Sequence, residues 1–205
     1  DLMEEDYQNW LAHFLEHMAF NGSKSFQEVI PHFLNRRGIK QFNAQTGQDE
    51  TIYYINRVPT KDELLVDSCL LVLKDWSGFL LLDPVEIDKE RGVIFEERRS
   101  RRDVGERVRE QTDPYLFNHS KYATRNVIGT VEVLENFTPE ELRAYYKDYY
   151  RPDQQAVIVV GDVDVVKIEK EIQRLFNPIP KRENPKPRLV YEIPDNMEPL
   201  YTKVI

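Results

Sequence analysis

Residues 8–20 set the strictest condition on the fold, because they form a helix that is apolar on most of its circumference. The large apolar residues recur at spacings of three and four: Trp10, Leu11, Phe14, Leu15, Met18 and Phe20. Such a helix must be buried, so the rest of the chain has to pack around it. It nevertheless contains His13 and His17, and each of these needs a polar partner in the interior.

The spacing of the two histidines suits a metal ion. Positions i and i+4 of a helix share one face, so His13 and His17 can present two imidazoles to one ion, with Glu16 beside them. Imidazole suits Zn²⁺, and a carboxylate that does not bind the metal can take a proton from an attacking water. The pattern indicates half of a catalytic zinc site. The competing interpretation gives each histidine a separate core or surface role and leaves Glu16 solvated.

A catalytic zinc site needs a third protein ligand and an open position for water. The charged helix expected after Pro84 carries Glu90 and Glu97 two turns apart, so one can bind the metal while the other holds a ligand or substrate group. The pattern itself does not choose among the candidates, which are Cys69, His32, His119, Glu90, Glu96 and Glu97. His32 and His119 have no partner at ligand spacing and are expected at the surface or in loops.

The rest of the chain separates helices from a hairpin, which is typical of the α+β class. Helices are expected over 25–37, 60–82, 84–102, 138–149 and 163–176, a hairpin over 39–58, a buried strand over 156–161 and a last strand over 201–205. Capping boxes at 60–63 and 138–141 mark two helix starts. We expect a catalytic domain in 1–177 and a Pro-rich extended connector in 178–205, leading to a following domain.

The charge and the cysteine content exclude several classes of protein. With 28 basic and 36 acidic residues, the net charge of −8 argues against a broad basic surface for nucleic acid. The local cluster Arg98, Arg99, Arg101 and Arg102 is expected on a solvated helix face, paired with nearby glutamates. No apolar run approaches the ~20 residues of a membrane span. Cys69 is the single cysteine, so no internal disulfide can form, and its apolar neighbours indicate a buried side chain.

Seven short segments together carry a wider pattern than the histidine motif. They are AHFLEHMAFNG (12–22), NAQT (43–46), DETIY (49–53), ERGVIFEE (90–97), TPEEL (138–142), YRP (150–152) and VVGDVD (159–164). In these segments the chain resembles the inverted-motif zinc peptidases, or inverzincins, a family that includes pitrilysin, insulysin and the mitochondrial processing peptidase. The likeness is greatest to the bacterial zinc proteases of that family.

The resemblance implies a division of roles within the site. Zinc would bind His13, His17 and Glu97, and Glu97 follows His17 by 97 − 17 = 80 positions, within the range that the family uses. Glu16 would be the base that activates water. Glu90 would be a carboxylate behind the ligands that holds one of them in place.

The resemblance also implies a fold, a substrate and a partner. The fold would be the N-terminal catalytic half-domain, a mostly antiparallel sheet with helices packed on one face, here without its N-terminal strands. Asn43 and Ala44 would lie on an edge strand that pairs with an extended or unfolded peptide, which the zinc endopeptidase then cleaves. Family members enclose substrate between two homologous halves. A second half, fused or separate, is therefore the expected partner, and the isolated chain is expected to need it for activity.

Two alternatives stay open. A non-catalytic scaffold relative of the processing peptidase would keep the fold, but such relatives typically lose metal ligands. S-ribosylhomocysteine lyase also uses the histidine motif with a cysteine as third ligand, for which Cys69 is the only candidate. The sequence does not fix the compartment, although the bacterial periplasm or cell envelope is slightly favoured over the cytoplasm.

Overall fold

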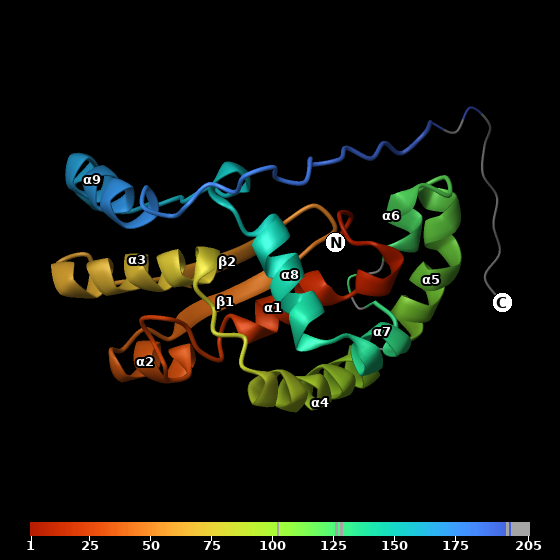
Figure 1. The fold of residues 1–205 in the computed structure, drawn as a ribbon, viewed down its shortest axis with the longest axis horizontal. Coiled ribbons are helices and arrows are strands. Elements are labelled where there is room, and N and C mark those ends of the chain that lie inside the picture. The colour runs from red at the N-terminus through yellow and green to blue at the C-terminus, as the bar shows by residue number, and fades with distance from the viewer. Residues whose placement is uncertain (102, 126, 128, 196, 198–205) are drawn as a thin grey trace.

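The computed structural model describes residues 1–101, 103–125, 127, 129–195 and 197, and Figure 1 shows its fold. Helices dominate it: α1 (Leu11–Met18), α2 (Ile30–Arg36), α3 (Glu63–Gly78), α4 (Pro84–Arg101), α5 (Val104–Leu116), α6 (Lys121–Thr124), α7 (Val131–Asn136), α8 (Pro139–Tyr149) and α9 (Val165–Phe176), with 3-10 turns η1 (Asp6–Gln8) and η2 (Pro152–Gln154). Strands β1 (Gln41–Thr46) and β2 (Thr51–Asn56) form an antiparallel pair. In the described part of the chain, no helix is both long and apolar enough to cross a bilayer.

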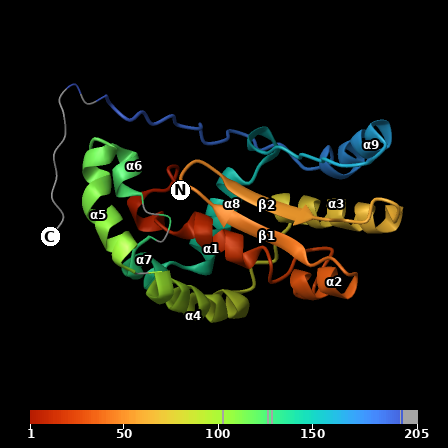
Figure 2. The same ribbon diagram turned by 180° about the vertical axis from the view of Figure 1, so that it is seen from behind.

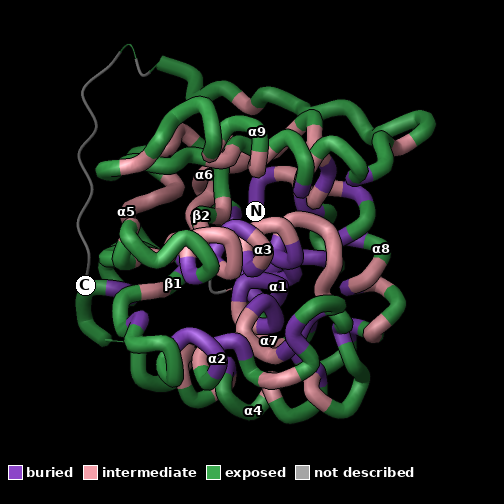
Figure 3. The backbone as a smooth tube through the Cα atoms, turned by 90° about the vertical axis from the view of Figure 1, so that its left-hand side faces the viewer, coloured by how far each residue is buried: buried purple, intermediate pink, exposed green. Residues whose placement is uncertain are grey.

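Helix α1 lies at the centre because its apolar side chains are buried on all sides, as its periodicity predicts. Leu11, Phe14 and Leu15 are fully buried, and burying a side chain of this size stabilises the fold by about 1.5–3 kcal/mol. They share one core cluster with Ile94 of α4 and Leu134 of α7. Figure 3 shows that the buried backbone is concentrated along α1. Polar groups on this helix are therefore fixed in a rigid interior.

The start of α1 is held by a carboxylate from an earlier segment. Trp10 precedes the helix and has no side-chain acceptor with which to cap it. Instead, Glu4 Oε1 accepts a hydrogen bond from Ala12 N at 2.7 Å, and Glu4 Oε2 accepts one from Trp10 N at 3.3 Å. A carboxylate in this position satisfies free backbone N–H groups and interacts favourably with the helix dipole.

The expected hairpin is present and lies against α1 (Figure 2). Its register pairs Phe42 with Ile55 and Thr46 with Thr51. The Phe42 and Ile55 side chains pack against a second core cluster, which contains Trp76 of α3. Trp76 Nε1 donates a hydrogen bond to Ala19 O at 2.7 Å, so α3 is tied to the end of α1. The hairpin is thereby fixed beside the central helix.

Helix α3 begins and ends at residues other than those expected. Asp62 is the N-cap, and its Oδ1 accepts a hydrogen bond from Leu65 N at 3.1 Å. The capping box predicted over 60–63 is therefore wrong, because a carboxylate nearer to the first turn takes that role. The helix ends at Gly78, before the predicted end at residue 82.

The charged stretch after Pro84 forms two helices. Helix α4 ends at Arg101, and Asp103 caps α5 by accepting a hydrogen bond from Glu106 N at 2.9 Å. Arg102, the last residue of the predicted helix, lies outside the described residues. The capping box predicted over 138–141 is confirmed at the start of α8.

The buried strand predicted over 156–161 is wrong. The segment forms no strand, and most of its residues are exposed, with Ile158 at 80% and Val160 at 92%. An apolar run becomes a buried strand only where other strands pair with it, and the described residues give this segment no such neighbour. The described residues from 178 to 195 form no helix or strand, and the strand predicted over 201–205 lies outside the described residues.

The prediction of the fold class was correct, but the prediction of the size of the sheet was not. The described chain is an α+β structure, as predicted, but helices dominate it. A mostly antiparallel sheet overstates what the described residues contain, because only β1 and β2 pair as strands among them. The overestimate has the same cause as the error at 156–161, since pairing between distant strands leaves no local pattern in the sequence.

Candidate metal centre

Helix α1, which lies in the interior of the molecule, carries His13, Glu16 and His17. The two imidazole centroids are 4.8 Å apart, and the rings are nearly perpendicular. His13 is 5% exposed and Glu16 is 9% exposed, so both are held in an environment that water reaches poorly. The helical spacing thus brings two nitrogen donors and one carboxylate together.

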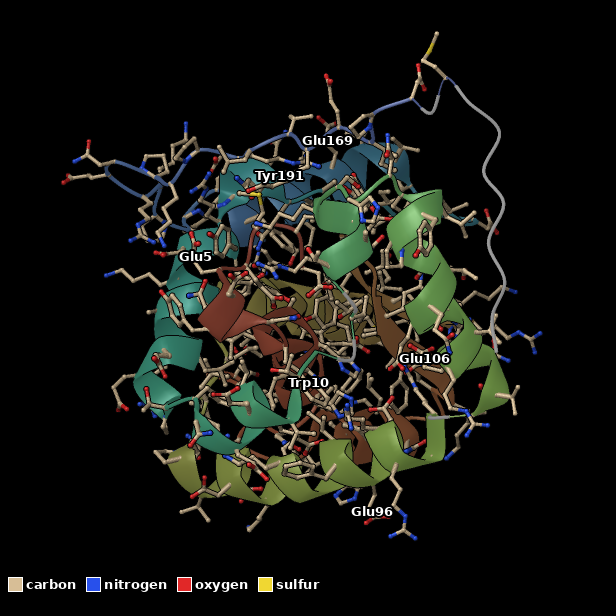
Figure 4. The ribbon with its side chains drawn as sticks, turned by 90° about the vertical axis from the view of Figure 1, so that its right-hand side faces the viewer. Glu5, Trp10, Glu96, Glu106, Glu169 and Tyr191 are labelled. Carbon is tan, nitrogen blue, oxygen red and sulfur yellow. The ribbon has the colours of Figure 1, made fainter. Side chains whose placement is uncertain are left out.

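Helix α4 adds two further carboxylates because of how it packs. Its inner face is set by Ile87 and Ile94, which are fully buried in the core cluster around α1. Glu90 and Glu97 each follow one of these isoleucines by three positions, so both project toward α1. Glu96 instead lies on the outer side of α4, where its side chain is 71% exposed (Figure 4).

The side chain of Glu97 closes a set of three donors with the histidines. Glu97 Oε2 lies 3.0 Å from His17 Nε2 and 3.7 Å from His13 Nε2, and the three ligand atoms all lie within 4.8 Å of one another. Among the described residues, this buried oxygen has no hydrogen bond of normal geometry. A buried acceptor without a hydrogen bond, facing two imidazole nitrogens, fits a metal ion. Two imidazoles and a carboxylate are a donor set that suits Zn²⁺.

Glu90 is hydrogen-bonded to the far side of His17. Its Oε1 lies 2.8 Å from His17 Nδ1, and its Oε2 accepts a hydrogen bond from Asn21 Nδ2 at 3.0 Å. A carboxylate at Nδ1 keeps a proton on that nitrogen and leaves the Nε2 lone pair free for a metal. Glu90 therefore holds the His17 ring from the nitrogen opposite Glu97.

The two histidines differ in their electrostatics. Burial, together with the neighbouring His17, lowers the pKa of His13 to about 4. Burial also acts to lower the pKa of His17, but the hydrogen bond to Glu90 and the interaction with the Glu97 carboxylate outweigh burial and raise the pKa to about 9. The interaction with His17 in turn lowers the pKa of Glu97. In the metal-free chain a proton on His17 thus balances carboxylate charge, and a metal ion has to displace it.

Glu16 is held by the end of β1. Thr46 Oγ1 donates a hydrogen bond to Glu16 Oε2 at 2.5 Å, and Thr46 Oγ1 lies 3.3 Å from Thr51 Oγ1 on the neighbouring strand. Burial raises the pKa of Glu16, whereas the hydrogen bond from Thr46 lowers it. A carboxylate with a raised pKa is better suited to accept and return a proton near neutral pH.

All seven residues expected in the site lie around one cavity of about 410 Å³. Its lining consists of His13, Glu16, His17, Phe20, Asn21, Asn43, Ala44, Gln45, Thr46, Glu90, Glu97, Arg101 and Val127. Helices α1 and α4 supply the donor groups, and β1 forms one wall. Donors for a metal, a carboxylate beside them and a strand edge thus share one space.

Comparison with family models assigns most of the chain. Residues 1–125 match the model described as insulinase, peptidase family M16, and residues 136–203 match the model described as the peptidase M16 inactive domain. The chain belongs to peptidase family M16. The resemblance to the pitrilysin and insulysin group is thereby confirmed.

Relatives within M16 are zinc proteases and processing peptidases. The chain is 35% identical over 167 residues to the probable zinc protease PqqL of Escherichia coli K12, covering 80% of this chain and 18% of that protein. It is 29% identical over 187 residues to the mitochondrial-processing peptidase subunit beta of Saccharomyces cerevisiae, covering 87% of this chain and 38% of that protein. A crystal structure described as the periplasmic protease PqqL from Escherichia coli superposes with a TM-score of 0.86 at 30% identity, covering 95% of this chain and 22% of that one. This M16 chain therefore spans about a fifth of the length of PqqL.

Three contacts of this M16 site were not expected from the sequence. Arg101 lines the cavity and forms an ion pair with Glu97 Oε1, a contact that the i,i+4 spacing could have indicated. Thr46 bonds Glu16, and Trp10 Nε1 donates a hydrogen bond to His13 Nδ1 at 3.1 Å. The contacts of Thr46 depend on how the hairpin lies against α1, which no local pattern reveals.

Several sequence candidates lie outside the cavity. Cys69 is buried in the second core cluster, where burial raises the pKa of its thiol to about 11, and it does not line the cavity. His32 and His119 are exposed, as expected. Arg99 pairs with Glu96 at 3.6 Å on the exposed face, as expected. Arg101 instead lines the cavity, so the solvated role predicted for the arginine cluster is wrong at that residue.

Proposed function

We propose that this chain is the zinc-binding catalytic half of a metalloendopeptidase. The observation that carries the proposal is the meeting of His13, His17 and Glu97 at one point, with the Glu16 carboxylate beside it in the same cavity. Two nitrogens and one oxygen leave a fourth position for water in a tetrahedral zinc site. The relatives described as zinc proteases support the same metal.

Each group of the site has a distinct task in peptide hydrolysis. Zinc, when bound, supplies Lewis acidity that polarises the scissile carbonyl. It also lowers the pKa of water, so that the water can lose a proton and attack that carbonyl. Glu16 takes the proton from the attacking water and delivers it to the leaving amine. Glu90 keeps a proton on His17 Nδ1, so that Nε2 faces the ion. Arg101 engages Glu97 Oε1 and leaves Oε2 for the metal.

The substrate is proposed to be an extended or unfolded peptide. Asn43 and Ala44 line the cavity from β1, and in the described residues β1 pairs as a strand only with β2, on one of its two edges. The other edge offers backbone N–H and C=O groups to an added strand. Such pairing reads the peptide backbone more than its side chains. We also propose that β1 and β2 belong to a larger antiparallel sheet with helices on one face.

The complete enzyme is proposed to contain a second homologous half. This proposal is supported by the share of PqqL that the chain spans, about a fifth. Residues 1–177 would form the catalytic unit, and 178–205 would connect it to the next domain. The description of one relative as a periplasmic protease favours the bacterial periplasm or cell envelope as the compartment.

The two alternative functions have less support. A scaffold relative would be expected to have lost metal ligands, whereas the donor set here is complete. The lyase interpretation needs Cys69 near the histidines, and Cys69 does not line the cavity.

Peptide cleavage tests the proposal. A quenched fluorescent peptide without stable structure is incubated with the zinc-loaded chain, alone and joined to a candidate second half, with Glu16→Gln as the matched variant. We expect cleavage by the combined halves and none by Glu16→Gln, although that variant keeps its zinc. Cleavage that survives in Glu16→Gln would contradict the role given to the base.

A further inference from the structure

The two proposed zinc ligands on α1 are not equally prepared for a metal. His17 has an acceptor, Glu90, at its Nδ1, which is the arrangement that metal-binding histidines normally show. His13 has a donor in the equivalent place. Trp10 Nε1–H donates a hydrogen bond to His13 Nδ1 at 3.1 Å, and an indole nitrogen can only donate.

This hydrogen bond fixes the position of the proton on His13. Because Nδ1 accepts the indole N–H, its lone pair is occupied, so the ring is neutral and its single proton is on Nε2. Nε2 is the nitrogen that lies 3.7 Å from Glu97 Oε2, on the side of the proposed ion. In this tautomer His13 offers the metal an N–H group instead of a lone pair.

We propose that Trp10 is a positioning residue that holds metal-free His13 in the tautomer that cannot bind zinc, so that zinc loading requires release of the indole N–H. The inference rests on the proposed zinc site. When Nε2 binds the ion, the ring proton is on Nδ1. Two N–H groups then face each other and neither can accept, so the hydrogen bond from Trp10 must break.

Trp10 is also held in place by its surroundings. It is 1% exposed, and Figure 4 shows it inside the molecule. Its φ of 138° is one that residues with side chains rarely adopt, and such backbone persists only where neighbouring contacts enforce it. Glu4 accepts a hydrogen bond from its backbone N–H. A Cβ on Gly129 would lie 2.9 Å from Trp10 Cβ, so only glycine leaves room for the indole.

Nuclear magnetic resonance of the ¹⁵N-labelled chain tests the inference directly. The chain has two tryptophans, and Trp76 donates its indole N–H to Ala19 O instead of to a histidine, so its signal is an internal control. We expect zinc to shift the Trp10 indole signal and leave that of Trp76 in place. The imidazole ¹⁵N signals of His13 should show the proton on Nε2 without metal and on Nδ1 with zinc.

Zinc affinity gives the second readout. Trp10→Phe removes the competing hydrogen bond, and we expect zinc to bind about fivefold more tightly, since one hydrogen bond of ordinary strength is lost from the metal-free state alone. Trp76→Phe, a matched loss of a buried indole, should leave the affinity unchanged. If Trp10→Phe does not fold, the spectra of the unaltered chain decide the question.

The outcomes separate this inference from the proposed function. Zinc binding with both indole signals unmoved, or a metal-free His13 protonated at Nδ1, would overturn the role of Trp10 and leave the zinc site standing. A chain that binds no zinc at any concentration would overturn the proposed function and this inference together.

Discussion

Replacement of Glu90 by glutamine should change zinc affinity in a way that depends strongly on pH. Glu90 has two opposing effects on His17. In the proposed zinc site it orients the ring for the metal, and it helps to raise the pKa of His17 to about 9, so that a proton competes with zinc. Glu90→Gln keeps an acceptor for the His17 Nδ1–H but removes the negative charge.

The two effects can be sized from the structure. With a pKa of about 9, proton competition weakens zinc binding by about 100-fold at pH 7 and by only about twofold at pH 9. Loss of an outer carboxylate of this type costs about 10- to 100-fold in metal affinity. At pH 7 the His17 ring of the variant is less well oriented, but a proton competes less with zinc. The zinc affinities of the variant and the unaltered chain should therefore differ by less than about tenfold at pH 7. Above pH 9 the full loss of about 10- to 100-fold should appear.

Competition against a chromogenic zinc chelator between pH 6.5 and 9.5 measures this dependence. Glu96→Gln, the same substitution on the outer face of α4, is the control and should match the unaltered chain at every pH. A ratio of affinities that stays constant across this range, or that is largest at pH 7, would refute the assignment of both effects to Glu90.

Three further predictions concern the core, the start of α1 and the single cysteine. Phe14→Ala should lower the free energy of unfolding by about 3–5 kcal/mol in urea titrations, because Phe14 is fully buried at the centre of the core; a loss below about 1 kcal/mol would contradict that placement. Burial raises the pKa of Glu4 to about 7, so the folded state is favoured most at acidic pH, where Glu4 is protonated. As the pH rises from 4.5 through about 7, ionisation of Glu4 should lower the free energy of unfolding by about 3 kcal/mol. Glu4→Gln should remove this decline, and an equal decline in both proteins would count against it. Cys69→Ala should leave bound zinc unchanged, and metal loss in that variant would revive the lyase interpretation.

Features that depend on neighbours in the sequence could be predicted well. The central helix is indicated by spacings of three and four, the hairpin by a period of two, and the start of α8 by the reciprocal cap of Thr138 and Glu141. The two histidines one turn apart likewise share a face by helix geometry alone. In each case the interactions that fix the structure span no more than one or two turns.

Features that depend on distant contacts could not be predicted from local pattern. Nothing within α4 distinguishes Glu97 from Glu96 as a donor, and the choice came from the family resemblance; in the structure the packing of Ile94 decides which carboxylate faces α1. The strand prediction over 156–161 was wrong for the same reason. The sequence shows the β propensity of a segment but not whether another strand lies beside it. The contact of Thr46 with Glu16 also arises only after packing.

The most direct test of the central claim is to locate the ion. Crystals of the zinc-loaded chain, measured on both sides of the zinc absorption edge, give an anomalous difference map, and the bound zinc is counted in parallel for Glu16→Gln and Glu97→Gln. We predict a single strong peak in contact with His13 Nε2, His17 Nε2 and Glu97 Oε2, zinc retained in Glu16→Gln and strongly reduced in Glu97→Gln. A peak that excludes Glu97, or equal zinc loss in the two variants, would contradict the account.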